Sequence, residues 1–259
     1  MSAPPLDGTT ALLTASSSGI ALAAAKALAE AGVPRLMLNG RTEESCRAAA
    51  RAVSVAVPSA RVLYTVADAS VRTDARRLVQ ATVEAFGPIS FLMNSVGGAA
   101  PPAPFHTLSP ETFGPHVDSH LMSVLEVTHA VLPHMVECGG GTIVNVASDA
   151  AKVPTPGEAV IGALKAGVAM FSRTLALEAS RSGIRVHCLT PSIVRGTKTY
   201  ERVMADPFSR KLFEKAESRA RLGVVTPEDI APLIVFLASP AASRMTGQVL
   251  SVNGGISAG

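Results

Sequence analysis

The segment Thr14-Ala-Ser-Ser-Ser-Gly-Ile-Ala21 is the most informative part of the sequence for predicting the fold. It follows the apolar run Ala11–Thr14, which predicts a strand, and it precedes the Ala-rich run Ala21–Ala31, which predicts a helix. A turn of small residues between a strand and a helix lets backbone N–H groups and the helix N-terminus approach a phosphate group. A Ser-rich helix cap is an equally good interpretation of this segment alone, because it contains a single glycine, Gly19.

The same alternation of strand and helix continues along the chain. Further strands are predicted at Arg35–Asn39, Arg61–Val66, Ile89–Asn94, Thr142–Val146, Arg185–Leu189 and Gln248–Val252. Helices are predicted between them at Glu43–Val55, Val71–Phe86, Pro110–Val136, Val160–Ser180 and Pro227–Ala238. The strands are nearly continuous apolar runs, which is typical of parallel strands covered on both faces. The sequence therefore predicts one α/β domain over residues 1–259, with a doubly wound parallel sheet of about seven strands.

The composition narrows the functional classes. Of the 259 residues, 47% are hydrophobic and 17% are charged, which excludes an intrinsically disordered chain. The net charge of +3 comes from dispersed basic residues, and aromatic residues are scarce. A surface of this kind has neither the basic patch nor the stacking platform that nucleic acids bind, so we expect no nucleic-acid partner.

The compartment is predicted from what the sequence lacks. No run of 18 or more apolar residues occurs, and the N-terminus has no charged segment followed by an apolar one, so we expect neither a membrane span nor a signal peptide. The three cysteines are Cys46, Cys138 and Cys188, and their spacing matches no metal site. We therefore expect a cytoplasmic protein with reduced cysteines and no metal.

The motifs that follow the predicted strands resemble those of the short-chain dehydrogenase/reductase family. Thr14-x-x-x-x-Gly19-Ile20 resembles the TGxxxGIG cofactor turn of the family, with Ala15 and Ala21 in place of the first and third glycines. Pro191-Ser-Ile-Val-Arg-Gly-Thr197 resembles its PGxxxT segment, with Ser192 in place of glycine. The resemblance covers about residues 7 to 256 and implies a Rossmann-type fold and an oxidoreductase that uses a nicotinamide dinucleotide.

The resemblance implies the residues that bind this cofactor. They are Thr14, Ser16, Ser17, Ser18, Gly19, Ile20, Arg41, Asp68, Ala69, Asn94, Val96, Gly97, Lys165, Pro191, Ile193 and Thr197. The second strand ends in Asn39-Gly40-Arg41, without the acidic residue that binds a ribose 2′-hydroxyl. Because Arg41 can pair with a phosphate, NADP(H) is favoured over NAD(H). Asp68 corresponds to the adenine-contacting aspartate of the family, and capping of the next helix is the alternative role.

The catalytic positions of the family are Asn, Ser, Tyr and Lys, and two of the four differ here. Ser148 resembles the serine that hydrogen-bonds a substrate carbonyl, and Lys165 resembles the lysine of the YxxxK motif. The tyrosine position falls on Ile161, and the asparagine position falls on His120. Because isoleucine cannot exchange a proton, the resemblance predicts an atypical active site. His120 is the best replacement donor by its ordinary pKa, with Lys165 as an alternative.

Other acidic or phenolic groups are weaker candidates for the missing donor. Enoyl reductases of the family carry their tyrosine seven residues before the lysine, where this chain has Glu158. Asp149 and Tyr200 lie in flanking segments, and Tyr64 lies in a predicted strand far from the motif. A substrate that brings its own proton, such as an iminium ion, needs no donor at all.

Three functions remain open on the sequence. The first is an NADP(H)-dependent oxidoreductase for a small carbonyl, imine or alcohol, with a non-standard proton donor. The second is a non-redox enzyme (an isomerase, dehydratase or hydrolase) on the same scaffold. The third is a catalytically inactive cofactor-binding subunit.

The segment 192–222 corresponds to the substrate lid of the family, although simple helix packing explains its apolar residues equally well. The resemblance also implies a homo-oligomer, a tetramer or a dimer, formed through the helices Pro110–Val136 and Val160–Ser180.

Overall fold

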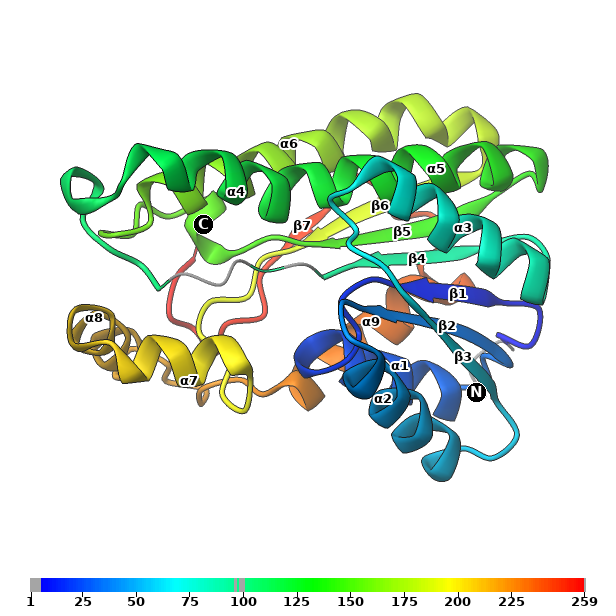
Figure 1. Cartoon of the computed structure of the whole chain (residues 1–259), viewed down its shortest axis with the longest axis horizontal. Coiled ribbons are helices and arrows are strands. Elements are labelled where there is room, and N and C mark those ends of the chain that lie inside the picture. Colours follow the sequence, from blue (N-terminus) through cyan, green and yellow to red (C-terminus); the bar gives the residue numbers. More distant parts are fainter. Residues whose placement is uncertain (1–5, 96, 98–100, 259) are drawn as a thin grey trace.

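A single twisted sheet forms the centre of the protein (Figure 1). The computed structural model describes residues 6–95, 97 and 101–258. Over these residues, seven parallel strands lie in the order β3-β2-β1-β4-β5-β6-β7. They are β1 (Thr10–Leu13), β2 (Arg35–Gly40), β3 (Arg61–Val66), β4 (Phe91–Asn94), β5 (Gly141–Val146), β6 (Ile184–Leu189) and β7 (Val249–Leu250). The predicted doubly wound α/β fold is confirmed.

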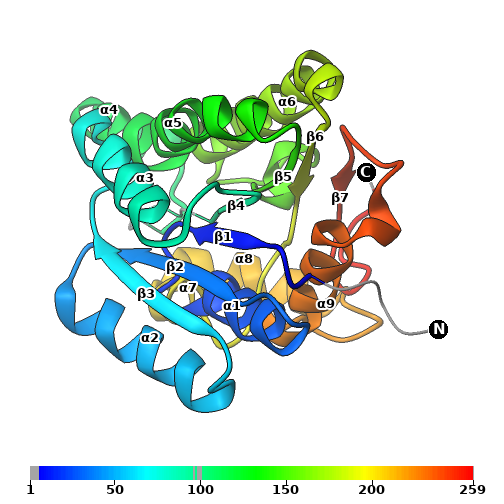
Figure 2. The same ribbon diagram turned by 90° about the vertical axis from the view of Figure 1, so that its right-hand side faces the viewer.

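Helices cover both faces of the sheet (Figure 2). On one face lie α1 (Gly19–Glu30), α2 (Glu43–Ala56) and α9 (Pro227–Ala238), and on the other lie α3 (Arg72–Phe86), α5 (Ser123–Glu137) and α6 (Ala159–Ala179). The strand order reverses between β1 and β4, because β2 and β3 extend the sheet in one direction and β4 to β7 in the other. In sheets of this kind a crevice opens at the carboxyl ends of the strands where the order reverses.

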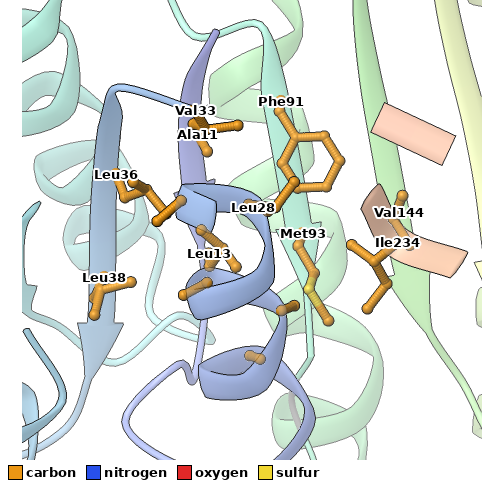
Figure 3. Packing of buried hydrophobic residues seen from close by; sticks show 14 of the residues in the cluster. Ala11, Leu13, Leu28, Val33, Leu36, Leu38, Phe91, Met93, Val144 and Ile234 are labelled. Carbon is orange, nitrogen blue, oxygen red and sulfur yellow. The ribbon is translucent and has the colours of Figure 1, made fainter. Parts of the chain in front are cut away.

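The core beneath the first face is built from small and branched side chains (Figure 3). Leu28 of α1 and Ile234 of α9 pack with Phe91 and Met93 of β4, and all four have almost no exposed surface. The alanines of α1 let it approach both the sheet and α9 closely. Tight packing therefore fixes the start of α1, which directly follows the turn after β1.

The predicted helix Pro110–Val136 is wrong as one continuous helix. The chain instead forms a 3₁₀ turn at Pro110–Thr112, the short helix α4 (Phe113–Val117), a π-helical turn at Asp118–Met122 and then α5. Pro115 has no N–H group to donate to the preceding turn, and the π-helical turn admits one extra residue per turn. This segment lies along the crevice, so its irregular backbone determines where His120 points.

Two helices in the predicted lid cover the crevice beyond the carboxyl ends of the strands (Figure 1). They are α7 (Lys198–Ala205) and α8 (Pro207–Glu217), which begin with side-chain caps from Thr197 and Asp206. Ser209 is fully buried and donates a hydrogen bond to the Pro102 carbonyl at 2.8 Å. The amide of Ala103 in turn donates to the Gly157 carbonyl at 3.0 Å, so α8 is attached to the segment that precedes α6.

One described segment, Ala159–Ser182, is long and apolar enough to cross a membrane by length and composition alone. It comprises α6 and the turn after it, and one third of its most apolar window is buried. The buried side of α6 contacts β6 and carries Lys165 into the crevice. The exposed side of α6 also carries apolar side chains, which packing within the protein does not explain.

Candidate active site

A pocket of about 950 Å³ occupies the crevice at the carboxyl ends of the strands. Most of the predicted site residues line it, namely Ser17, Ser18, Gly19, Ile20, Arg41, Asp68, Ala69, Gly97, His120, Ser148, Ile161, Lys165, Pro191, Ile193 and Thr197. Thr14, Ser16 and Asn94 lie beneath the pocket with no exposed surface. Val96 lies outside the described residues. The structure thus brings together residues from the first 20 positions and from positions near 200.

The turn after β1 is held in shape by the side chains of Ser16, which lies beneath the pocket, and Asn39, which lines it. The Ser16 hydroxyl donates to the Leu13 carbonyl at 2.8 Å and accepts the Asn39 amide at 2.9 Å. The Asn39 side chain accepts the amide of Ala15 at 3.3 Å and donates to the Thr65 and Ala67 carbonyls. Asn39 therefore ties the turn to the ends of β2 and β3. The sequence indicates only that Asn39 ends a strand and does not predict that its side chain holds the turn.

The N-terminus of α1 opens into the pocket and fits an anion. Ser18 is the N-cap residue, but its side chain makes no capping hydrogen bond, and the first turn of α1 carries no acidic residue. The first amide groups of a helix have no partner within the helix, and their partial positive charge attracts an anion. Gly19, with φ +60, lies close to Thr197, since a Cβ built on it would be 3.5 Å from Thr197 Cγ2. The pyrophosphate of a dinucleotide fits this position.

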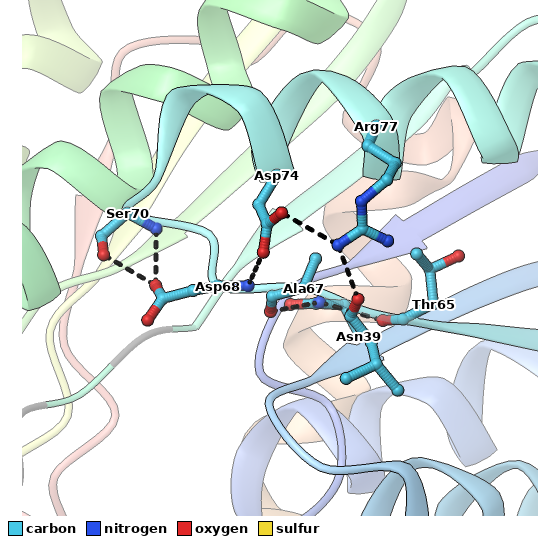
Figure 4. Close-up of polar contacts among 8 residues, drawn as sticks. Asn39, Thr65, Ala67, Asp68, Ser70, Asp74 and Arg77 are labelled. Carbon is cyan, nitrogen blue, oxygen red and sulfur yellow. Dashed lines mark hydrogen bonds and ion pairs between the residues drawn. The ribbon is translucent and has the colours of Figure 1, made fainter.

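The ends of β2 and β3 form the neighbouring wall of the pocket (Figure 4). The Asp68 carboxylate accepts hydrogen bonds from the amide and hydroxyl of Ser70 at 2.9 and 2.7 Å. The Asp68 amide donates to Asp74, which also pairs with Arg77 at 2.9 Å. Asp68 thus organises the turn before α3 while it still lines the pocket. The capping role considered for Asp68 is wrong, because Val71 is the N-cap residue of α3 and no side chain caps this helix. Arg41 is exposed at the pocket edge.

Five fully buried polar residues form a network under the pocket. The Asn94 side chain donates to Thr128 and to Asn145, both at 3.0 Å, and its carbonyl oxygen accepts the Thr14 hydroxyl at 3.4 Å. Asn145 donates to Ser172 of α6 at 2.9 Å. The network connects β1, β4, β5, α5 and α6. Asn94 therefore fixes the frame of the site from below.

Ser148, Ile161 and Lys165 face the same part of the pocket. Ser148 follows β5, and its hydroxyl oxygen accepts the Ala150 amide at 3.2 Å, which leaves the hydroxyl proton available to an oxygen in the pocket. Lys165 is only 4% exposed, and its ammonium donates to the Val146 carbonyl at 3.2 Å. Burial lowers the pKa of Lys165 to about 8. Ile161, one helical turn earlier, presents only hydrocarbon to the pocket.

His120 lines the pocket from the π-helical turn. Its ring is 4% exposed, and neither ring nitrogen has a hydrogen-bond partner among the described residues. Burial, the charge of Lys165 and the nearby His116 lower the pKa of His120 to about 3. The imidazole is therefore neutral at neutral pH. This environment opposes the predicted role of His120 as the replacement proton donor, because the protonated form is strongly disfavoured.

Two carboxyl groups, those of Asp149 and Glu158, line the same pocket as Ile161. Asp149 is 6% exposed, and both of its oxygens accept the Ser257 hydroxyl, at 2.8 and 2.6 Å. Glu158 lines the pocket directly before α6, and burial together with the charge of Asp149 raises the pKa of Glu158 to about 7. Glu158 was the weaker candidate on the sequence, because no sequence pattern indicates that the charge of Asp149 acts on it.

The two tyrosines do not take the place of Ile161. Tyr64 is half-buried on β3, and its hydroxyl donates to Glu43 at 2.7 Å. Tyr200 of α7 does line the pocket, but its hydroxyl donates to Glu217 at 3.2 Å, and Glu217 also pairs with Arg195 at 3.1 Å. The phenol of Tyr200 is therefore committed to a contact within the predicted lid.

Comparison with known proteins agrees with this arrangement. Residues 14–257 match the protein family described as enoyl-(acyl carrier protein) reductase. A 3-oxoacyl-[acyl-carrier-protein] reductase from Chlamydia muridarum is 32% identical over 246 residues, which covers 95% of this chain and 96% of that protein.

Two solved structures are similar over nearly the whole chain. Levodione reductase superposes with a TM-score of 0.90 at 30% identity and covers 96% of this chain and 97% of its own. An NADPH-bound short-chain oxidoreductase from Pseudomonas aeruginosa PAO1, described as containing an atypical catalytic center, superposes with a TM-score of 0.89. It is 28% identical and covers 98% of this chain and 99% of its own.

Proposed function

The chain belongs to the short-chain dehydrogenase/reductase family, and from this membership we propose that it is an NADP(H)-dependent oxidoreductase without a catalytic tyrosine. Its substrate would be a small carbonyl compound, imine or alcohol. One observation carries the proposal: the anion-receptive start of α1 and the buried Lys165 and Ser148 open into the same pocket of about 950 Å³.

The residues of the pocket fit a nicotinamide dinucleotide. The uncapped amide groups at the start of α1 suit the pyrophosphate, and the wall at Asp68 and Ala69 suits the adenine ring. Two observations support NADP(H), namely Arg41 at the pocket edge and the lack of an acidic residue at the end of β2. When bound, such a cofactor supplies or accepts a hydride. The NADPH bound to the similar oxidoreductase from Pseudomonas aeruginosa supports the same choice.

Ser148 and Lys165 would prepare the substrate and the cofactor. The free hydroxyl proton of Ser148 suits a hydrogen bond to the substrate oxygen, which polarises a carbonyl group. The ammonium of Lys165 suits the ribose hydroxyls of the nicotinamide half, and its charge stabilises negative charge that develops nearby. Ile161 would exclude water and pack against the reacting atoms, but it has no proton to give. The proton must therefore come from another group.

Titration with NADPH and NADH tests the cofactor assignment. We expect wild-type protein to bind NADPH more tightly than NADH. The Arg41→Ala variant should bind NADPH about 10–100-fold more weakly, because a charge-assisted hydrogen bond to a phosphate is lost, and its affinity for NADH should not change. Arg51→Ala, at an exposed position on α2, is the matched control.

Turnover with small ketones, aldehydes and cyclic imines then separates the three functions that the sequence leaves open. Oxidation of NADPH with any of these substrates supports the oxidoreductase. Failure to bind either cofactor would contradict the proposal. Tight binding of NADPH without hydride transfer to any carbonyl or imine would contradict it in favour of a non-redox enzyme or an inactive subunit.

A further inference from the structure

We infer that the carboxyl group of Glu158 is the proton donor and acceptor of this oxidoreductase. The inference rests on the proposed function and names the group that takes the place of the phenol. It depends on the position of Glu158 on α6, on the groups that surround it, and on the engagement of the other candidate donors.

The first observation is the position of Glu158 at the start of α6. Glu158 is the residue directly before α6, and its carbonyl accepts the Gly162 amide at 2.6 Å, so it begins the hydrogen-bond pattern of the helix. Residues three and seven positions further on, Ile161 and Lys165, lie on the same side of a helix. All three line the pocket. Along the helix axis, Glu158 and Lys165 thus lie on either side of Ile161 in one pocket.

The surroundings of Glu158 favour its protonated form. The side chain is half-buried, and in the described part of the chain no hydrogen-bond donor contacts its carboxyl group. Asp149, which is held by Ser257, places a second carboxylate near it. Burial and this like charge give Glu158 a pKa of about 7. A donor titrating near the working pH combines a large protonated fraction with easy release of the proton.

Other charged groups also line the pocket, and their positions differ from that of Asp149. His120 and Asp118 come from the π-helical turn, Lys165 from α6, Lys215 from α8, and Arg219 from the turn that follows α8. Lys198 and Arg202 come from α7. Among the charged groups that line the pocket, Asp149 is the one that raises the pKa of Glu158. The two carboxyl groups together therefore set the protonation state of Glu158.

The other candidate donors are less suited to the task. The proton of a charged His120 is lost near pH 3, far below neutral pH. The Tyr200 hydroxyl donates to Glu217 in the predicted lid. The Lys165 ammonium is buried against the Val146 carbonyl, and loss of its proton would remove the charge that stabilises the reacting atoms. Among these groups, Glu158 combines a place in the pocket lining with a pKa of about 7 and with no hydrogen-bond partner for its carboxyl group in the described part of the chain.

The proton step balances without any further reactant. In the reducing direction, the carbonyl carbon receives the hydride of NADPH with its electron pair, and the C=O π bond breaks. The O–H bond of the Glu158 carboxyl group breaks as a new O–H bond forms on the substrate oxygen. The carboxylate that remains then takes a proton from water, and in the oxidising direction the same carboxylate accepts the alcohol proton.

Replacement of the carboxyl group by an amide tests the step. In Glu158→Gln we expect kcat for carbonyl reduction to fall about 10²–10⁴-fold, as for loss of a positioned general acid, with unchanged affinity for NADPH. The wild-type rate should fall above about pH 7, where Glu158 loses its proton, and the variant should lack this decline. Glu178→Gln, at the exposed far end of α6, is the matched control. An unchanged kcat and pH profile in Glu158→Gln would overturn the inference.

A rescue variant distinguishes chemistry from general damage. Adding Ile161→Tyr to Glu158→Gln restores an acidic hydroxyl on the same helix face, so we expect it to recover carbonyl reduction without the decline near pH 7. A double variant that binds NADPH, and reduces substrate no faster than Glu158→Gln alone, would count against proton donation at this place.

Urea denaturation at several pH values tests the inference without a measurement of enzyme activity. A carboxyl group whose pKa is raised by folding destabilises the native state progressively as the pH rises from its unfolded value to its folded value. Wild type should therefore lose stability relative to Glu158→Gln between about pH 4.5 and about pH 7 in urea denaturation. A difference that does not change with pH would overturn the inference. Failure of wild type to bind NADPH would instead overturn the proposed function itself.

Discussion

At the scale of single residues, Ala15 adopts a backbone conformation that favours glycine. Its φ is +48, and it is the one non-glycine residue of the described chain with a positive φ. The left-handed region costs a residue with a Cβ about 1–2 kcal/mol relative to glycine. The amide of Ala15 stays in place because Asn39 accepts its hydrogen bond. The cofactor turn therefore keeps a glycine-type shape without its first glycine.

Replacing Ala15 by glycine should stabilise the protein. Relief of the left-handed strain outweighs the greater freedom of glycine in the unfolded chain, so we expect Ala15→Gly to raise the free energy of unfolding by about 0.5–1 kcal/mol. Urea denaturation measures the change. Ala21→Gly, in the right-handed backbone of α1, should lower the free energy of unfolding by about 1 kcal/mol. Destabilisation by Ala15→Gly would show that the turn carries no such strain.

We expect the buried charge of Lys165 to lower the free energy of unfolding of the protein. At pH 7 the Lys165 ammonium is buried and charged, and removal of a buried charge in favour of hydrocarbon commonly stabilises a protein. We expect Lys165→Met to raise the free energy of unfolding by on the order of 1–3 kcal/mol below pH 8, while abolishing turnover. Folding lowers the pKa of Lys165 to about 8, so the advantage of the variant should shrink as the pH rises above 8. An advantage that is constant from pH 7 to pH 10 would contradict this account.

At the scale of helices and strands, the buried polar network links the sheet to the helices that carry the site. Asn94 occupies its centre and satisfies Thr14, Thr128 and Asn145 at once. Each of these groups is buried, so water cannot replace a lost partner. The network therefore holds β5 and α6, and with them Ser148 and Lys165, in a fixed register.

Removal of the central amide should be costly. Asn94→Leu leaves several buried donors and acceptors without partners, so we expect a loss of about 2–4 kcal/mol in the free energy of unfolding. Thr128→Val removes one acceptor with the same shape and should lose about 1 kcal/mol. Thermal and urea denaturation check both values. Equal losses for the two variants would show that Asn94 is not the centre of the network.

The sequence patterns predicted the positions of the strands and most helices, but they did not predict where a helix is interrupted. The apolar strands and the small-residue turn at Thr14–Ala21 predicted the sheet and the place of the crevice correctly. The single long helix over Pro110–Val136 was wrong, since its apolar period does not reveal the π-helical turn that carries His120. The pairing of Glu158 with Asp149 was also out of reach, because it joins two segments through their tertiary packing.

At the scale of the whole molecule, the exposed side of α6 carries a row of apolar side chains. Ala163, Met170 and Leu177 recur every seven residues and are all exposed, with Met170 at 59% and Leu177 at 78%. Side chains at this spacing share one face of a helix. An exposed row of apolar side chains on a long helix is typical of an interface. It supports the homo-oligomer that the family resemblance implies, with α6 at its interface.

A charge in this row should separate the subunits. We expect wild type to sediment as a dimer or tetramer, and the double variant Met170→Glu and Leu177→Glu to sediment as a monomer, because two carboxylates would have to be buried. Val55→Glu, at a side chain of α2 that is 72% exposed, should leave the assembly unchanged. A wild type that is monomeric at micromolar concentration would contradict the prediction.

A crystal structure of the complex with NADPH checks the cofactor site and the role of Glu158 together. We expect the pyrophosphate at the start of α1, the 2′-phosphate beside Arg41, and the nicotinamide ring in front of Ser148 and Ile161. We also expect the Glu158 carboxyl group to be the proton-bearing side chain nearest to the reacting carbon. A nicotinamide ring outside this pocket, or a tyrosine hydroxyl in place of Glu158 beside it, would contradict the account.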